Sequence, residues 1–304
     1  MSTAVCLAEV GPKVGLGHYR RSGALVKALE QSGILCHFVF RDEVCRKLVL
    51  DEGWTNLLWD GTVNGLPPAD IGIIDSYAVD ANFFRAARSS YRVLVTIDDF
   101  ADRQLDVDLV INQNLFANDL DYGQIHCLLG PDYALVDDSF RTARERGYNQ
   151  SRFVVTFGGT DDGKFAAIAV EAILQVRPEA EIDVVISPLV TQMQAVEAIK
   201  QRHGSSVTIH HGADMPTLMS GACLYVGGAG STVYEAAVAG VAIVAVVMGG
   251  NHKRNGAALE LVGVPVVGHL DQEALSDAIV GELERIMVRP LSARVDGHGA
   301  ARAA

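Results

Sequence analysis

The chain has 304 residues, which exceeds the length of a typical single domain, so two domains are expected. Apolar residues make up 49% of the sequence and charged residues 20%, as in a globular protein with a sizeable core. The formal net charge of −12 argues against a general nucleic-acid binder, which is usually basic. It leaves room for a small phosphorylated ligand, because backbone N–H groups and single basic side chains can hold one.

The termini and the cysteines bear on the compartment. The N-terminus lacks the basic region, long apolar stretch and cleavage site of a signal peptide. The longest apolar run, residues 241–248, is far too short to span a bilayer. The five cysteines are scattered without metal-ligand spacing, which favours reduced thiols. We therefore expect a cytoplasmic protein that does not insert into a membrane.

Short apolar segments alternate with helical patterns through the first half of the chain. Strands are predicted at residues 4–10, 34–40, 71–74, 93–97 and 109–112. Helices are predicted at residues 18–32, 43–52 and 81–89. Around residues 141–150 the sequence turns charged and polar and has no apolar face, which predicts a domain junction.

The second half repeats the alternation. Strands are predicted at residues 153–157, 182–187, 207–210, 224–226 and 241–248, and helices at 165–176, 190–202 and 215–220. Such alternation indicates parallel sheets with right-handed crossovers. The sequence therefore predicts an α/β protein with Rossmann-like domains at residues 1–141 and 151–290. Residues 291–304 have no core pattern and are predicted to be a flexible tail.

Two glycine-containing segments each follow a predicted strand and open a helical pattern. The first runs from Gly15 to Arg21 and the second from Gly227 to Glu235. Ligands of open α/β sheets bind at the carboxyl ends of strands, where N–H groups of helix starts favour anions. The two segments together therefore indicate a phosphate-containing ligand.

The second segment is the candidate phosphate loop. Its glycines allow close approach of a ligand because no Cβ intervenes. Ser231 and Thr232 add hydroxyls at the first turn of the helix, and Glu235, one turn further, could accept hydrogen bonds from ribose hydroxyls. The alternative is a tight strand–helix turn with Ser231 as N-cap. The similar N-terminal segment favours phosphate binding.

His18 is the candidate general base. An imidazole at a helix start is disfavoured as a cation, so it should stay neutral and able to take a proton from water. The alternative is a capping or core histidine. Arg20 and Arg21 place positive charge in the same first turn, which opposes the helix dipole and is explained if an anion binds nearby.

Polar residues also follow other predicted strands. Tyr77 could hydrogen-bond a sugar, and Asp98 could orient His18 or a substrate hydroxyl. Loop and cap chemistry accounts for each of them equally well. Asp98 and Asp99 have no third ligand placed by spacing, so no metal and no cofactor is assigned.

These residues resemble the PseG-like UDP-sugar hydrolases of the pseudaminic-acid pathway. That family has the GT-B architecture, also found in MurG, of two Rossmann-like domains whose parallel sheets face each other across a cleft. The similarity runs over roughly residues 4–285. The residues that carry it are Gly15, Gly17, His18, Arg21, Ile74, Asp75, Tyr77, Ile97, Asp98, Asp99, Asp106, Asp108, Leu109, Asn112, Asn114, Leu129, Gly130, Pro131, Tyr133, Ala134, Leu135, Gly158, Gly159, Thr160, Asp161, Gly228, Ala229, Gly230, Ser231, Thr232, Glu235 and Asn251.

The resemblance implies an inverting hydrolysis without a metal. The C-terminal glycine loop would hold the diphosphate, with Glu235 on the ribose. His18 would activate water to attack the anomeric carbon and expel UDP, and Tyr77 and Asn251 would place the sugar and the nucleophile. The further substrate-binding residues would be Gly17, Arg21, Asp98, Gly159, Thr160, Gly228, Gly230, Ser231, Thr232 and His252.

Three functions remain open at this point: a UDP-sugar hydrolase, a GT-B glycosyltransferase that passes the sugar to a small soluble acceptor, and a nucleotide-sugar-binding protein without catalysis. His18 together with Tyr77 argues against the third. The N-terminal half shows no clear apolar or basic membrane patch, which favours water as acceptor. Ser76 stands where the family often has His, and His252 where it often has Gln. The sugar therefore stays open.

Overall fold

The computed structural model describes residues 2–11, 14–41, 46, 54, 56–143, 149–190, 194–285 and 289–304. The chain divides into two compact units. Unit 1 comprises Met1–Asp137 and His298–Ala304, and unit 2 comprises Asp138–Gly297. The predicted helix at residues 43–52 lies almost entirely outside the described residues, as does half of the predicted junction at residues 141–150.

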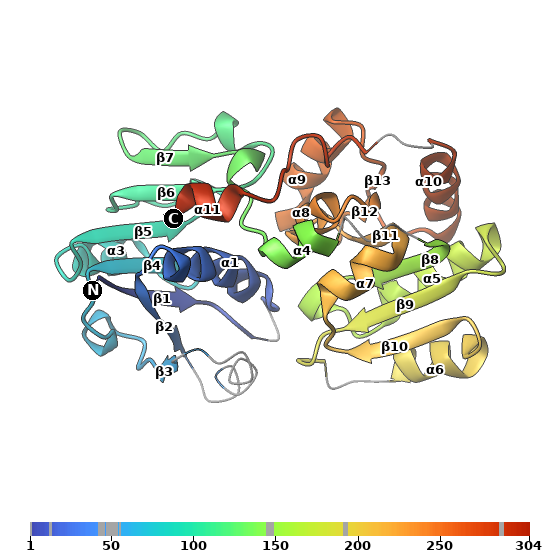
Figure 1. Ribbon diagram of the computed structural model, residues 1–304, viewed down its shortest axis with the longest axis horizontal. Coiled ribbons are helices and arrows are strands. Elements are labelled where there is room, and N and C mark those ends of the chain that lie inside the picture. The colour runs from blue at the N-terminus through green and yellow to red at the C-terminus, as the bar shows by residue number, and fades with distance from the viewer. Residues whose placement is uncertain are drawn as a thin grey trace. The chain divides into compact units, whose positions relative to one another are not determined.

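Unit 1 is built on a seven-stranded parallel sheet with the order β3-β2-β1-β4-β5-β6-β7 (Figure 1). Its strands are β1 (Thr3–Ala8), β2 (Leu35–Phe40), β3 (Asn56–Leu58), β4 (Ile71–Asp75), β5 (Val93–Ile97), β6 (Leu109–Asn112) and β7 (His126–Leu129). Its helices are α1 (Gly17–Gln31), α3 (Ala81–Ala87) and α11 (Gly299–Ala303), with short 3-10 turns η2 (Val63–Gly65), η3 (Ala117–Asp119) and η4 (Pro131–Tyr133).

Alternate residues of β1 enter two separate cores, one on each face of this sheet. Ala4 and Cys6 pack with α1 and with Ala300 of α11. Val5 and Leu7 pack with Phe84 of α3 on the other face. Both faces of the sheet are therefore covered, which is why its strands read as continuous apolar runs.

Unit 2 is built on a six-stranded parallel sheet with the order β10-β9-β8-β11-β12-β13. Its strands are β8 (Asn149–Thr156), β9 (Glu181–Ile186), β10 (Val207–His211), β11 (Ala222–Gly228), β12 (Ala242–Val246) and β13 (Val266–Val267). Its helices are α4 (Asp138–Ala143), α5 (Lys164–Val176), α6 (Gln194–His203), α7 (Met215–Gly221), α8 (Thr232–Val238), α9 (Gly250–Leu261) and α10 (Gln272–Glu284), with a 3-10 turn η6 (Gly158–Thr160).

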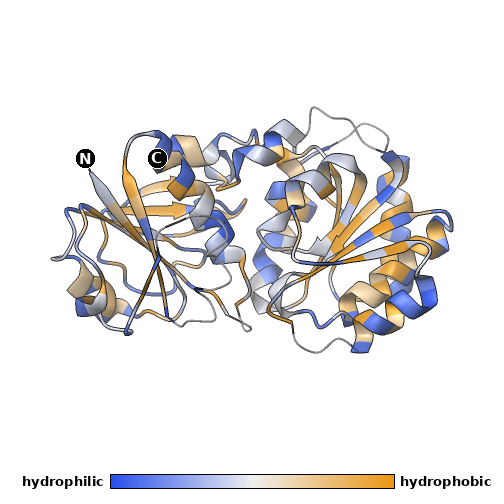
Figure 2. Ribbon diagram, turned by 60° about the horizontal axis from the view of Figure 1, so that its bottom comes forward, coloured by the Kyte–Doolittle hydropathy of each residue, from blue (hydrophilic) through white to orange (hydrophobic). Residues whose placement is uncertain are grey.

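The main core of unit 2 lies between one sheet face and the helices α5, α6 and α10. The middle of the sheet is mostly hydrophobic, whereas these helices turn hydrophilic residues outward (Figure 2). On the other side α7 contacts β8 and β11, α8 contacts β11 and β12, and both helices contact α4. No helix in the described part of the chain is long and apolar enough to cross a membrane.

Each sheet has one point beside its first strand where the strand order reverses. In unit 1 this point lies between β1 and β4, and in unit 2 between β8 and β11. Ligands of open parallel sheets bind outside the carboxyl ends of the strands at such a switch point. The residues that follow these four strands are therefore the first candidates for a site.

The C-terminal segment differs from its prediction. Leu291 and Val295 are each 1% exposed, and the last residues form α11, which packs on α1 and on η4. Gly299 fits there because a Cβ would come within 2.3 Å of the Ala134 carbonyl oxygen. The prediction of a flexible tail is therefore wrong. The small residues of α11 are held by close backbone packing, which leaves no apolar stripe in the sequence.

Glu282 of α10 gives a stability prediction for unit 2. Its side chain is buried, and its Oε2 atom has no hydrogen-bond partner among the described residues. Burial raises the pKa of Glu282 to about 7, and Arg285 offsets this only in part. Between pH 4.5 and 7 the folded state keeps a proton that the unfolded state has released, so this group lowers stability as the pH rises.

Glu282→Gln is therefore expected to raise the free energy of unfolding by up to about 3 kcal/mol at pH 8 and to change it little at pH 4. Urea denaturation at the two pH values measures this. Glu284→Gln, an exposed neighbour on the same helix, is the control and should show neither effect. Equal stability of Glu282→Gln and the parent protein at pH 8 would contradict the assignment.

Candidate functional site

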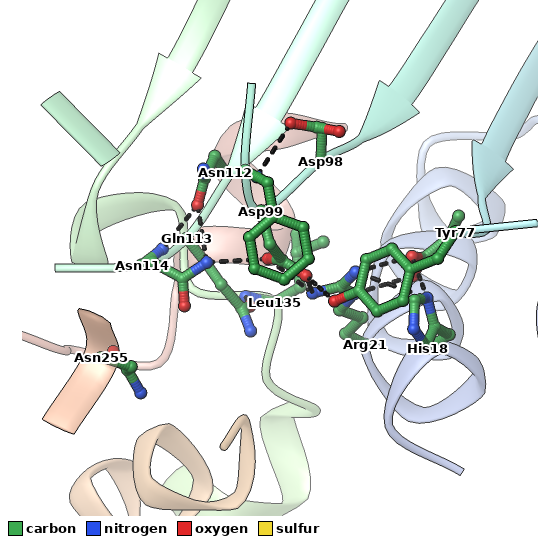
Figure 3. Close-up of polar contacts among 12 residues, drawn as sticks. His18, Arg21, Tyr77, Asp98, Asp99, Asn112, Gln113, Asn114, Leu135 and Asn255 are labelled. Atoms are coloured by element: carbon green, nitrogen blue, oxygen red, sulfur yellow. Dashed lines mark hydrogen bonds and ion pairs between the residues drawn. The ribbon is translucent and has the colours of Figure 1, made fainter. Parts of the chain in front are cut away.

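A buried polar cluster lies at the carboxyl ends of β1, β4 and β5 in unit 1 (Figure 3). It contains His18 and Arg21 from α1, Asp75 from the end of β4, and Asp99 after β5. Their exposed fractions are 5%, 6%, 0% and 7%. Four ionisable groups buried together need mutual pairing, because an isolated buried charge is strongly disfavoured.

Helix α1 brings two of these groups to the edge of the sheet. His18 and Arg21 are three residues apart, so they lie on the same face of the helix. That face is buried, and its two side chains contact Asp75 and Asp99. The anions beside Arg21 in this structure are the carboxylates of Asp75 and Asp99.

Asp75 is the hydrogen-bond partner of His18. The His18 Nδ1 atom lies 2.5 Å from Asp75 Oδ1. Arg21 and His18 outweigh burial and hold the pKa of Asp75 well below its usual range, so this carboxylate only accepts. His18 must therefore carry its proton on Nδ1. Among the described residues, no side chain or backbone group hydrogen-bonds the Nε2 atom, which is left with a free lone pair.

Arg21 links the two carboxylates. Its Nε and Nη2 atoms donate to the two oxygens of Asp75 at 2.8 and 2.7 Å, and its Nη1 donates to Asp99 at 2.8 Å. Burial disfavours the charged guanidinium, but the two carboxylates outweigh it and raise the pKa of Arg21. They make this cation a permanent part of the cluster.

Tyr77 connects the cluster to the surface. Although the residue is 38% exposed, its hydroxyl lies among the buried groups and donates to Asp99. Burial and the nearby Asp99 raise the pKa of Tyr77, so the phenol stays protonated. Its ring meets the His18 imidazole edge to face, with centroids 4.4 Å apart. The ring thus borders the imidazole, and the hydroxyl oxygen keeps a lone pair for another donor.

Asp98 does not contact His18, which it was predicted to orient. Its Oδ2 atom accepts from the amides of Phe100 and Ala101 and from the Tyr122 hydroxyl. Its Oδ1 accepts from Arg103 at 3.3 Å. The side chain is 1% exposed and fixes the loop after β5. Asp75, not Asp98, therefore orients His18.

Two further residues belong to the cluster, and the sequence named them only as part of the resemblance, without a role in the site. Asn114 donates to Asp99 at 2.7 Å, and Asn112 accepts from Asn114 and donates to Tyr122. Both asparagines follow β6 or end it, so the pattern of polar residues at strand ends was the available signal. Asn114 thus adds a donor to Asp99, and Asn112 holds Asn114 in place.

The glycine loop of unit 2 lies at the switch point between β8 and β11. A Cβ on Gly227 would lie 2.1 Å from the carbonyl oxygen of Thr156, so only glycine fits there. Gly228 and Gly230 face the ring of His252. A Cβ atom on Gly228 would lie 3.1 Å from this ring, and one on Gly230 would lie 3.3 Å from it. His252 therefore packs directly on the loop. Burial lowers its pKa.

The Ser231 hydroxyl, at the start of the helix after this loop, does not cap the helix. Ser231 occupies the N-cap position of α8, but its side chain makes no cap hydrogen bond. The loop is held instead by Asn255 of α9, which donates to the Ala229 carbonyl at 2.8 Å and accepts from Tyr234. The expected alternative, a serine that merely caps its helix, does not describe Ser231. Thr232 begins α8, and Glu235 lies at the end of the first turn of this helix.

A short turn that contains Gly159 and Thr160, two of the predicted substrate-binding residues, follows β8. Gly158 has a φ of 77°, which favours glycine, and Gly159 and Thr160 complete η6. Asp161 then accepts from the amides of Gly163, Phe165 and Ala166 and so caps α5. The side chains of Thr160 and Asn251 lie outside the described residues, and Asn251 is placed only as backbone in α9.

No protein-family model matches this sequence, and no curated protein sequence matches it. Solved structures do. MurG from Acinetobacter baumannii has a TM-score of 0.64 at 16% identity, over 99% of this chain and 97% of that one. MnaA from S. aureus in complex with UDP has 0.65 at 12% identity, over 100% and 95%. Arabidopsis thaliana UGT89C1 with UDP-L-rhamnose has 0.61 at 12% identity, over 96% and 92%.

These similarities cover nearly the whole of each chain. Together with the two parallel sheets they establish that the chain has the GT-B fold. At sequence identities of 12% to 16%, the structural similarity shows the fold alone.

Proposed function

We propose that this protein hydrolyses a UDP-activated amino or deoxy sugar at its anomeric carbon, with inversion, and that His18 is the general base. One observation carries the proposal. A buried histidine is held through Nδ1 by a carboxylate, while its Nε2 lone pair is free beside Tyr77 at the switch point of unit 1. This is the arrangement of a base oriented by a third group.

The proposed reaction is a single displacement at the anomeric carbon. A water oxygen attacks the anomeric carbon and forms the new C–O bond while its proton passes to His18 Nε2. The bond from the anomeric carbon to the diphosphate breaks, and its electron pair leaves with UDP. Tyr77, whose hydroxyl hydrogen is bound to Asp99, offers its oxygen as an acceptor for a sugar hydroxyl or amide. Asn251 would help to place the sugar and the nucleophile.

The charges of the cluster favour this proton transfer. With His18 neutral, Arg21 faces two ionised carboxylates, Asp75 and Asp99, so the cluster has one negative charge in excess. When His18 takes a proton, the cluster becomes neutral. In a buried site, where charges interact strongly, this supports the imidazolium as the water is deprotonated.

Unit 2 supplies the proposed nucleotide site. The glycine loop, the uncapped hydroxyl of Ser231 and Thr232 would bind the diphosphate, and Glu235 the ribose. UDP or UDP-L-rhamnose is bound in two of the proteins of this fold, which supports UDP as the nucleotide. Gly159 and the ring of His252, both in unit 2, would border the nucleotide.

Incubation with a panel of nucleotide sugars without any acceptor tests the reaction. The proposal predicts free sugar and UDP in the NMR spectrum, and no reaction with the matched CDP-sugars. Turnover only after an alcohol or amine acceptor is added would replace hydrolysis by glycosyl transfer. Binding of UDP-sugars without turnover under either condition would leave a binding protein.

The assignment of the glycine loop has its own test. Ser231→Ala is expected to weaken UDP binding by about 1 kcal/mol or more, the loss of a hydrogen bond to a charged group. Glu235→Ala should weaken UDP more than an analogue that lacks both ribose hydroxyls. Calorimetric titration measures both, with Ser205→Ala, an exposed serine of unit 2, as the control. Unchanged UDP affinity in both variants would refute the loop as the nucleotide site.

A further inference from the structure

Glu9, at the end of β1, holds the turn that carries Tyr77. Its Oε2 atom accepts from the Tyr77 amide at 2.7 Å, the Ser76 hydroxyl at 2.9 Å and the Ala78 amide at 3.2 Å. The Ser76 hydroxyl in turn accepts from the Ala78 amide at 3.0 Å. One carboxylate oxygen thus gathers three donors from three consecutive residues.

The strand register creates this contact. β1 pairs in parallel with β4, with Ala8 opposite Asp75. The Glu9 amide continues the pairing by donating to the Asp75 carbonyl at 2.9 Å. Glu9 therefore lies beside the first residue after β4, and its side chain needs to span only the distance between neighbouring strands to reach the turn.

Tyr77 needs such support more than its neighbours do. His18 and Arg21 are set by a buried helix, and Asp75 by a strand. Tyr77 lies in an exposed turn, and besides the Glu9 contact it is held by its hydroxyl bond to Asp99 and by ring contacts with His18 and Phe100. The carboxylate of Glu9 fixes the backbone from which the tyrosine ring extends.

We propose that Glu9 is a positioning residue of the site: it fixes the Ser76–Ala78 turn so that the Tyr77 ring stays against His18 and its hydroxyl stays on Asp99. The functional part of this inference rests on the proposed hydrolysis, in which Tyr77 contacts the sugar. Glu9 acts as an acceptor of hydrogen bonds, so a neutral acceptor of the same shape should replace it.

The first experiment measures the turn itself and needs no activity. In Glu9→Ala, the amide hydrogen of Tyr77 should exchange about 10-fold faster or more, because it loses its acceptor. The amide hydrogen of Ala78 should change less, because it keeps the Ser76 hydroxyl as an acceptor. In Glu9→Gln, which keeps one carbonyl oxygen, exchange should stay close to that of the parent protein. Glu30→Ala, an exposed glutamate of α1, is the control. Unchanged exchange in a folded Glu9→Ala protein would overturn the proposal.

The second experiment measures turnover of the UDP-sugar in a double-mutant cycle. Glu9→Ala should lower kcat/KM by about 10- to 100-fold, since a small misplacement of a contacting group can have such effects. The same change made in a Tyr77→Phe background should have an effect of less than about 3-fold. Equal losses in both backgrounds would show that Glu9 does not act through Tyr77.

Two further variants complete the design. Glu9→Gln should restore most of the turnover, and a loss equal to that of Glu9→Ala would contradict a role as acceptor. If Glu9→Ala fails to fold, Ser76→Ala removes one of the three donors and should give the same pattern at smaller amplitude. A parent protein that turns over no UDP-sugar refutes the proposed function, while the exchange experiment still decides the role of Glu9.

Discussion

Replacing His18 by asparagine is expected to lower kcat by about 100-fold or more, the usual scale for loss of a general base. Asparagine keeps a hydrogen-bonding group near Asp75 but cannot accept the proton of water. Because the proposed nucleotide site belongs to unit 2, the affinity for UDP should stay within about 2-fold of the parent value. Steady-state kinetics and calorimetric titration of UDP measure the two quantities.

His126→Asn is the matched control, because this histidine is exposed on β7. It should leave turnover unchanged. The competing view is that His18 only completes a buried polar core. In that case His18→Asn would lower the melting temperature while a folded sample turned over substrate within a few-fold of the parent protein. That outcome would remove His18 from the mechanism.

Replacing Arg21 by leucine is expected to lower the free energy of unfolding by about 3–5 kcal/mol at pH 7, because it leaves two buried carboxylates without their cation. In the parent protein burial raises the pKa of Asp75 and of Asp99, but Arg21 together with His18, and with the Tyr77 hydroxyl at Asp99, outweighs burial and lowers both pKa values. Their contribution to stability is therefore present above their usual pKa near 4 and is lost as the pH falls through the lowered values.

The variant should depend on pH in the opposite way to the parent. Without Arg21, protonation of Asp75 and Asp99 relieves their repulsion and burial, so the deficit should narrow as the pH falls towards 4. Urea denaturation across this range gives the result. Arg85→Leu, an exposed arginine on α3 that bonds only Asn82 among the described residues, should change stability by less than about 0.5 kcal/mol. A deficit that is equal at pH 7 and pH 4 would contradict the electrostatic role of Arg21.

The sequence was sufficient to predict the parallel α/β fold. Helices cover the sheets, so the buried strands are short apolar runs that alternate with helical patterns. It was insufficient for the short edge strands β3 and β13, which have three and two residues. It was also insufficient for α11, whose burial depends on contacts with η4 and α1. Such elements depend on tertiary packing, which periodicity does not report.

For the site, the residue types were predictable and their pairing was not. Asp98, after β5, was the predicted partner of His18, whereas Asp75 at the end of β4 holds the imidazole. The choice between them depends on the strand order, since β4 lies next to β1 and therefore closer to the start of α1. Glu9 was missed because a single glutamate at a strand end has no local pattern. Its contacts follow from the register of β1 and β4 alone.

The central claim is that a water molecule, activated by His18, attacks the anomeric carbon of a UDP-sugar. The most direct measurement is turnover of the best substrate of the panel in water enriched in oxygen-18, followed by mass spectrometry of both products and by NMR of the sugar before it mutarotates. Attack by water on the anomeric carbon should place one heavy oxygen in the released sugar and none in UDP, and should invert the anomeric configuration. Heavy oxygen in UDP, or no free sugar until an acceptor is supplied, would contradict it.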